Sequence, residues 1–177
     1  MRFRQIKSDG KKVALTWVTK DSAGTEIARS LESSESPAPE FTAALAAFVP
    51  LVLDLLELPK KYAADDTLVV TGLSISESRD RRGLVITATK KVAGSNGPFN
   101  IATPHVQSKS EEGAPDGKGL ISDDMESALA DAEKAAEAFK NGARSQTELG
   151  LHEPPVRPSE DGIQEIHAAR ERDTAGV

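Results

Sequence analysis

The chain has no cysteine and only three histidines among its 177 residues. Without cysteine it can form no disulfide, offer no thiolate to a metal and use no thiol as a nucleophile. Two of the histidines, His152 and His167, lie in a stretch that we expect to be mostly disordered, and no HxH or HExxH spacing is present. The sequence therefore predicts a protein that is not an enzyme, with no catalytic residues, no metal site and no cofactor.

Neither a secretory leader nor a membrane-spanning run is expected from this sequence. Residues 1–7 alternate charged and apolar side chains, so we expect no signal peptide and a cytoplasmic location. The one long apolar segment, residues 41–58, is interrupted by Pro50 and Asp54. It falls short of the roughly 20 apolar residues that cross a bilayer, and it predicts a buried core helix and no membrane partner.

Charge is present but unevenly distributed. Residues 1–107 carry 14 basic and 12 acidic side chains, a net charge of +2, whereas residues 108–177 carry 8 and 16, a net charge of −8. The overall charge of −6 thus combines a slightly basic body with a strongly acidic remainder. This arrangement is typical of a body that binds or assembles and a tail that recruits a partner or keeps the protein in solution.

Short strands are predicted on both sides of one helix. Two alternating runs joined by Asp9-Gly10 predict a hairpin, and a weaker strand follows over residues 25–31. After the apolar helix come two β-branched runs, 67–75 and 83–92, and a short strand over 99–103. We expect an α+β fold, with an antiparallel sheet of about six strands in βββ-α-βββ order and the helix on one face.

The predicted apolar helix has apolar side chains on most of its sides, and these must be covered. Pro50 must kink or divide it, because proline removes a backbone hydrogen bond and crowds the preceding turn. A helix that is apolar on most sides needs more than one covering layer. We therefore expect it to pack on the sheet and also on another element or on a second copy of the chain. Its larger apolar side chains lie at helical spacing: Phe41, Leu45, Phe48, Val52 and Leu56.

Four segments are expected along the chain. Residues 1–106 form the α+β body, 107–121 a linker, 122–142 an acidic amphipathic helix, and 143–177 a mostly disordered acidic tail. The acidic helix begins at Ser122, a good N-cap residue. This helix needs a surface on which to lie, and the body is a candidate for that surface. The narrow apolar stripe of the helix consists of Met125, Leu129, Ala132, Ala136 and Phe139.

Three local patterns that suggest chemistry have simpler explanations. The glycine-rich segment 113–119 lacks the spacing of a phosphate-binding loop, and its lysine is followed by glycine. Asp123, Asp124 and Glu126 lie in the first turn of a predicted helix, where acids complement the helix dipole. His105 follows a proline at a strand end and is expected to be structural. It stays a candidate only for a small-ligand site, together with the arginines of the 79–82 hairpin.

Basic residues in two hairpins and at a strand end are candidates for contact with single-stranded DNA. In such a site cations follow the phosphates while an aromatic side chain stacks on the bases. The alternative is that hairpins and edge strands carry Lys and Arg to stay soluble and unpaired. The candidate nucleic-acid-binding residues are Arg2, Arg4, Lys11, Lys12, Trp17, Arg79, Arg81, Arg82, Lys90 and Lys91.

The most specific short peptide lies in the predicted tail, at residues 146–151 (QTELGL). It resembles the sliding-clamp-binding peptides of bacterial replication and repair proteins, in which a glutamine and spaced terminal hydrophobic residues enter a cleft on the clamp. Gly150 intervenes and Leu151 replaces the usual aromatic residue, so the match is partial. The resemblance implies a sliding clamp as partner and Gln146, Leu149 and Leu151 as the residues that bind it.

A wider resemblance covers about residues 1–151. The run 82–87 (RGLVIT), the later Thr103-Pro104-His105, and an acidic helix leading to residues 143–146 (ARSQ) together resemble uncharacterised small proteins encoded by tailed bacteriophages. The resemblance implies the cytoplasm of a host cell and a role near replication or recombination. It supplies no activity and no catalytic residues.

Three functions are compatible with these patterns. The favoured one is a non-enzymatic binding or assembly module, self-associating, that recruits a protein partner through its C-terminal helix and tail. An accessory protein of DNA replication or recombination, which contacts single-stranded nucleic acid through its basic hairpins, is the first alternative. A small-ligand-binding protein is the second.

Overall fold

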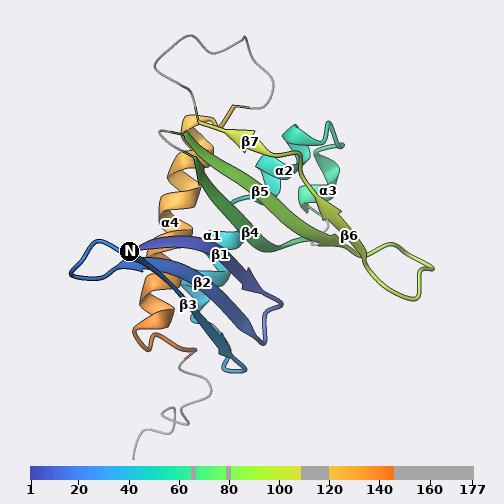
Figure 1. The fold of residues 1–177 in the computed structure, drawn as a ribbon. Coiled ribbons are helices and arrows are strands. Elements are labelled where there is room, and N and C mark those ends of the chain that lie inside the picture. The colour runs from blue at the N-terminus through green and yellow to red at the C-terminus, as the bar shows by residue number, and fades with distance from the viewer. Residues whose placement is uncertain (65–66, 79–80, 109–119, 146–177) are drawn as a thin grey trace, which may run out of the picture. The chain divides into compact units, whose positions relative to one another are not determined.

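An antiparallel sheet in the order β3-β2-β1-β4-β5-β6 forms one layer of the computed structural model (Figure 1). The structure describes residues 1–64, 67–78, 81–108 and 120–145. The predicted α+β fold, with a helical segment between the third and fourth strands, is confirmed. The strands are β1 Arg2–Ser8, β2 Val13–Lys20, β3 Glu26–Ser33, β4 Leu68–Ser78, β5 Arg81–Lys90, β6 Phe99–Ala102 and β7 Val106–Gln107.

The two-residue strand β7 was not predicted, and it ties the start of the expected 107–121 linker to the sheet. Val106 pairs with Leu84 and Gln107 with Gly83. The other end of the linker returns to the same place, because the amide of Ile121 donates to the carbonyl of Gln107 at 2.8 Å. Ile121 is only 4% exposed and belongs to the core. Both ends of the expected linker therefore rest on the body.

Pro50 divides the predicted central helix, as expected. Helix α1 spans Pro39–Ala46 and α2 spans Val49–Leu55, with Pro50 in the first turn of α2, where its missing N–H costs nothing. A single turn, α3 Lys61–Ala64, follows. Within the described ranges, no helix combines the length and the hydropathy that crossing a membrane requires.

The acidic helix α4, Asp123–Lys140, packs on α1 and on one face of the sheet (Figure 1). The hydroxyl of Ser122 accepts a hydrogen bond from the amide of Met125 at 3.2 Å, which caps the helix at the predicted residue. Phe139 is 1% exposed, and its ring centroid lies 5.7 Å from that of Phe41 on α1, with the rings tilted. The second layer expected over the apolar helix is thus α4 of the same chain.

The end of α4 is fastened to the segment that leads into α1. The guanidinium of Arg144 lies 3.7 Å from the ring centroid of Phe139, donates to the carbonyl of Phe139 and pairs with Glu35. This ion pair lowers the pKa of Glu35. The amide of Ser145 adds a hydrogen bond to the carbonyl of Ser36 at 3.2 Å. Side chain and backbone therefore both hold α4 against α1.

Residues 103–108 run along β5 as a strap held by two hydroxyl groups. The hydroxyl of Thr103 accepts a hydrogen bond from the amide of Ile86 at 3.0 Å, and that of Ser108 accepts one from the amide of Arg82 at 2.9 Å. The carbonyls of Ile86 and Arg82 accept in return from the amides of Thr103 and Ser108. The side chains thus extend a backbone pairing that β7 provides over only two residues.

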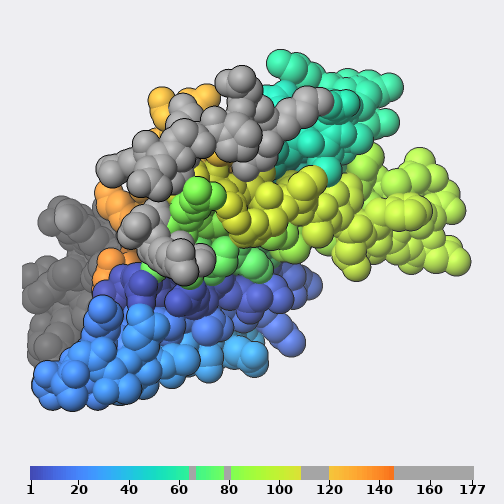
Figure 2. Space-filling view, turned by 45° about the horizontal axis from the view of Figure 1, so that its top comes forward, coloured from blue at the N-terminus to red at the C-terminus, as the bar shows by residue number. Residues whose placement is uncertain are grey.

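His105, in the middle of the strap, lies over Gly83. A Cβ atom on Gly83 would come within 2.2 Å of the His105 Nε2 atom and 2.5 Å of the Ser76 hydroxyl. The same Nε2 atom lies 3.0 Å from that hydroxyl, within hydrogen-bond distance. Glycine at position 83 therefore makes room for the imidazole. By contrast, the β5–β6 connection, residues 91–98, is exposed throughout and projects from the sheet (Figures 1 and 2).

We expect Phe139→Ala to lower the free energy of unfolding by about 3–5 kcal/mol, because it leaves a cavity against Phe41 in a fully buried site. Urea denaturation followed by circular dichroism measures the change. Glu137→Ala, on the exposed side of α4, is the matched control and should change stability by less than about 0.5 kcal/mol. Equal effects of the two changes would mean that α4 does not dock through Phe139.

Gly83→Ala should destabilise the protein by about 1–3 kcal/mol, because the new methyl group displaces the His105 ring. In a His105→Ala background the cost should fall, since the remaining close contact is the Ser76 hydroxyl, which can rotate. Gly97→Ala is the control, because no atom lies within 4 Å of the added methyl group. Thermal unfolding of the four variants and the wild type measures these differences. A cost at position 83 that persists without His105 would contradict this explanation.

Candidate functional site

The residues predicted to contact nucleic acid do not gather on one face. Trp17, the only candidate for base stacking among them, is 9% exposed and belongs to the sheet face that the helices cover. Its neighbours are Phe3, at 6.4 Å between ring centroids, and Lys140 of α4, whose Nζ atom lies 6.0 Å from the ring. Trp17 is therefore a core residue with no free ring face for a base.

Two of the five arginines among these candidates are paired with carboxylates. Arg2 forms ion pairs with Glu77 and with Glu26, and the carboxylate of Glu77 is the main cause of its raised pKa. Arg82 pairs with Glu133 of α4. The Arg82–Glu133 pair joins α4 to the sheet, and all three ion pairs neutralise cations that the nucleic-acid hypothesis needs.

The other candidates are dispersed. The Nζ atom of Lys90 lies 3.7 Å from the centroid of the Tyr62 ring and donates to the Thr67 hydroxyl. Arg81 and Lys91 are exposed at opposite ends of β5, and Arg4 is half-buried in β1. Lys11 and Lys12 are exposed in the β1–β2 turn, whereas Arg79 lies outside the described residues. The predicted clamp-binding residues also lie outside them: Gln146, Leu149 and Leu151.

A groove of about 640 Å³ runs between α1 and α4. We call it the α1–α4 groove. Alanines from both helices line it, with the rings of Phe41 and Phe139 packed beneath them, while Glu40, Asp131 and Lys134 supply its charges. The groove is thus apolar over most of its surface and remains open. Its alanines are Ala38, Ala43, Ala44, Ala47, Ala135, Ala138 and Ala143.

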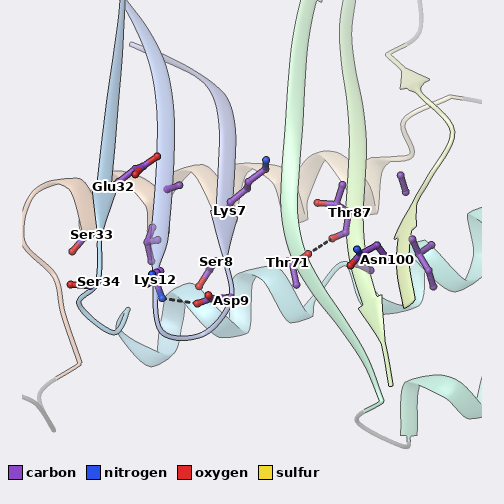
Figure 3. A pocket seen from close by; sticks show the side chains of 15 residues that line it. Lys7, Ser8, Asp9, Lys12, Glu32, Ser33, Ser34, Thr71, Thr87 and Asn100 are labelled. Carbon is purple, nitrogen blue, oxygen red and sulfur yellow. Dashed lines mark hydrogen bonds between the residues drawn. The ribbon is translucent and has the colours of Figure 1, made fainter. Parts of the chain in front are cut away.

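A second hollow, of about 700 Å³, lies on the sheet face that the helices leave open (Figure 3). It extends from the β1–β2 hairpin across β4 and β5 to β6. Lys7 is the basic side chain of β1 at this hollow and forms no ion pair with any described residue. The carboxylate of Asp9 is already bonded by the amides of Lys11 and Lys12, at 2.9 and 2.7 Å, which lower its pKa. Lys12 and Glu32 also line this hollow, so it holds two lysines without ion pairs among the described residues, together with two acids, of which Asp9 is already hydrogen-bonded.

A third hollow, of about 440 Å³, lies at the same end of the hairpin but against the helices. Ser8, Asp9 and Gly10 form one side of it, and residues 68–70 of β4 form another. Leu45 and Val49, from the α1–α2 segment, supply further apolar lining. The second and third hollows share Ser8 and Asp9, so they meet at the gap between the hairpin and β4.

The described residues contain no group of three or more His, Asp or Glu side chains placed to hold a metal ion. The contact between Ser76 and His105 lies on the exposed face of the sheet, where both side chains are open to water. A buried, water-excluding environment, which strengthens general base catalysis, is not found there. The sequence matches no family model, no curated protein and no solved structure.

Proposed function

We propose that this protein is a non-enzymatic assembly module that pairs with a second copy of itself through the α1–α4 groove and recruits a protein partner through its acidic tail. The groove is the observation that carries the proposal. It presents the alanine faces of two helices above a rigid aromatic layer. Small side chains let a further helix approach to an axial distance of about 8 Å and bury apolar surface along its length.

The exposed face of α4 is self-complementary, which favours a second copy as the occupant. Asp131 and Lys134 lie on this face, three residues apart. In an antiparallel pair of α4 helices about a twofold axis, Asp131 of each copy lies beside Lys134 of the other. The same register places two small residues opposite one another, Ala138 against Ser127. The charges and the sizes of the facing side chains are therefore compatible with this antiparallel register.

A dimer of this kind would carry two copies of residues 146–177. A partner that recognises one tail weakly binds two tails on one assembly more tightly, because the second contact is intramolecular. The sliding clamp implied by residues 146–151, and a place in replication or recombination of a tailed phage, belong to this part of the proposal. The nucleic-acid alternative is less favoured, because Arg2 and Arg82 are already paired and Trp17 is buried.

Light scattering after size-exclusion chromatography should give a mass twice the 18.8 kDa of the chain at micromolar concentration. Ala135→Glu should convert the dimer to a monomer, because it adds bulk and places a second negative charge near Asp131. Ala23→Glu introduces the same side chain in the exposed turn between β2 and β3, outside the groove, and should leave the dimer intact. A monomeric wild type would refute the proposal, and a dimeric Ala135→Glu variant would place the interface elsewhere.

The predicted register can be tested by exchanging its charges. Asp131→Lys alone should weaken the dimer, because it sets two pairs of like charges against each other. The double variant Asp131→Lys, Lys134→Asp should restore it, since both intermolecular pairs return with their signs reversed. Sedimentation equilibrium of the single and double variants measures the dissociation constants. Additive losses in the double variant would contradict the antiparallel register.

A further inference from the structure

Strand β4 loses its neighbour β1 partway along its length. The two strands pair only at Gln5↔Ser74, Ile6↔Leu73 and Lys7↔Gly72. Residues 68–71 of β4 continue beyond this point, and within the described part of the chain they pair with β5 alone. One edge of this half of β4 is therefore free, although the strand lies in the middle of the sheet.

A bulge explains why the strands separate here. The β4–β5 register shifts between Val70 and Gly72, which places Thr71 as the extra residue. A bulge bends its strand and increases the local twist, so the first half of β4 turns away from β1. Gly72 holds the two strands close just before the separation, since a Cβ atom there would lie 2.9 Å from Cγ of Lys7. Figure 3 shows β4 swinging away from the β1–β2 turn, with α1 behind the gap.

The gap between Ser8-Asp9 and residues 68–71, which we call the β4 notch, opens into a hollow on each face of the sheet. The hollow of about 700 Å³ lies on the open face, and Lys7 and Thr71 are among the residues that line it. The hollow of about 440 Å³ lies on the helix side, and Leu45 and Val49 supply apolar side chains to its lining. Side chains of an extended strand point alternately to the two faces of its sheet. A single extended chain in the notch would therefore direct alternate side chains toward the two hollows.

We propose that the β4 notch binds an extended segment of a partner protein as an added strand, with apolar side chains in the hollow on the helix side and acidic side chains beside Lys7. Main-chain hydrogen bonds to the free edge of β4 supply affinity, and the two hollows supply specificity. Four residues of a strand span roughly 13 Å. This surface is separate from the α1–α4 groove and does not depend on self-assembly.

The outer edge of β3 is the obvious rival site, and its chemistry is less suited to adding a strand. Every side chain from Glu26 to Ser30 is exposed, and none of the three hollows described above is lined by them. Glu26, Arg29 and Glu32 place charges along this edge, which is how natural sheets discourage pairing. At the notch, by contrast, Val69 remains 47% exposed next to the free edge.

The test uses the full chain and a synthetic peptide, acetyl-Val-Glu-Val-Glu-Val-Glu-Val-amide, as the probe. Amide NMR shifts should change at residues 68–71 and at Ser8 when the peptide is added. The same peptide with its central amides N-methylated should bind at least tenfold more weakly, because it cannot donate to β4. Undiminished binding of the methylated peptide, no binding at millimolar concentration, or shifts confined to β3 would overturn the proposal.

Charge reversal at Lys7 tests the assigned orientation. Lys7→Glu should lower affinity for the Val-Glu peptide about tenfold and raise affinity for the corresponding Val-Lys peptide. Lys20→Glu, at the other end of the hairpin, is the matched control and should change neither affinity by more than about twofold. Equal responses of the two variants would show that only overall charge matters and would refute the assignment. Shift changes in residues 146–177 on addition of the peptide would mean that the chain's own tail occupies the notch, which would also overturn it.

Discussion

The packing of α4 on α1 is the contact on which the rest of the molecule depends. It joins Phe41 to Phe139, two residues nearly the whole length of the body apart in sequence. The sheet covers only one side of α1, so without α4 the opposite side of Phe41 would face water at a cost of a few kcal/mol. Arg144 and Ser145 then close the contact at the end of the helix. The acidic helix is therefore part of the core, and only its outer face is free to bind another protein.

This contact also changes the meaning of the charge distribution. The basic body and the acidic remainder are separate along the sequence, but in the folded chain the acidic helix α4 packs against the body. Glu133 of α4 pairs with Arg82 of β5, and Lys140 covers Trp17. Part of the acid therefore balances cations of the body, in ion pairs that contribute on the order of 1 kcal/mol or less each because they are half-exposed. The uneven charge distribution first suggests nucleic-acid binding, but contacts within the fold already neutralise part of the basic charge.

The elements that the sequence predicts well are those with a local cause. Alternating side chains predict the strands, Pro50 predicts the division of the helix, and Ser122 predicts the start of α4. The groove and the notch have no such local signal. The alanines of α1 and α4 form one groove only after Phe41 meets Phe139, and the notch exists because a bulge at Thr71 falls where β1 pairing ends. Both depend on the relative placement of distant segments, which composition and periodicity do not encode.

Helix α1 lies between the two proposed surfaces, and this position has an energetic consequence. Its Ala43 and Ala44 line the α1–α4 groove, while Leu45 and the adjoining Val49 line the hollow of the β4 notch on the helix side. A partner in either place therefore contacts the same short helix from a different side. If α1 moves when a peptide fills the notch, peptide binding changes the free energy of dimer formation. Dimer formation must then change the free energy of peptide binding by the same amount, because coupling between two sites is reciprocal. If the α1–α4 contact holds α1 rigid, binding at one surface does not change the free energy of binding at the other. The packing of Phe139 against Phe41 therefore determines how strongly dimer formation and peptide binding can be coupled.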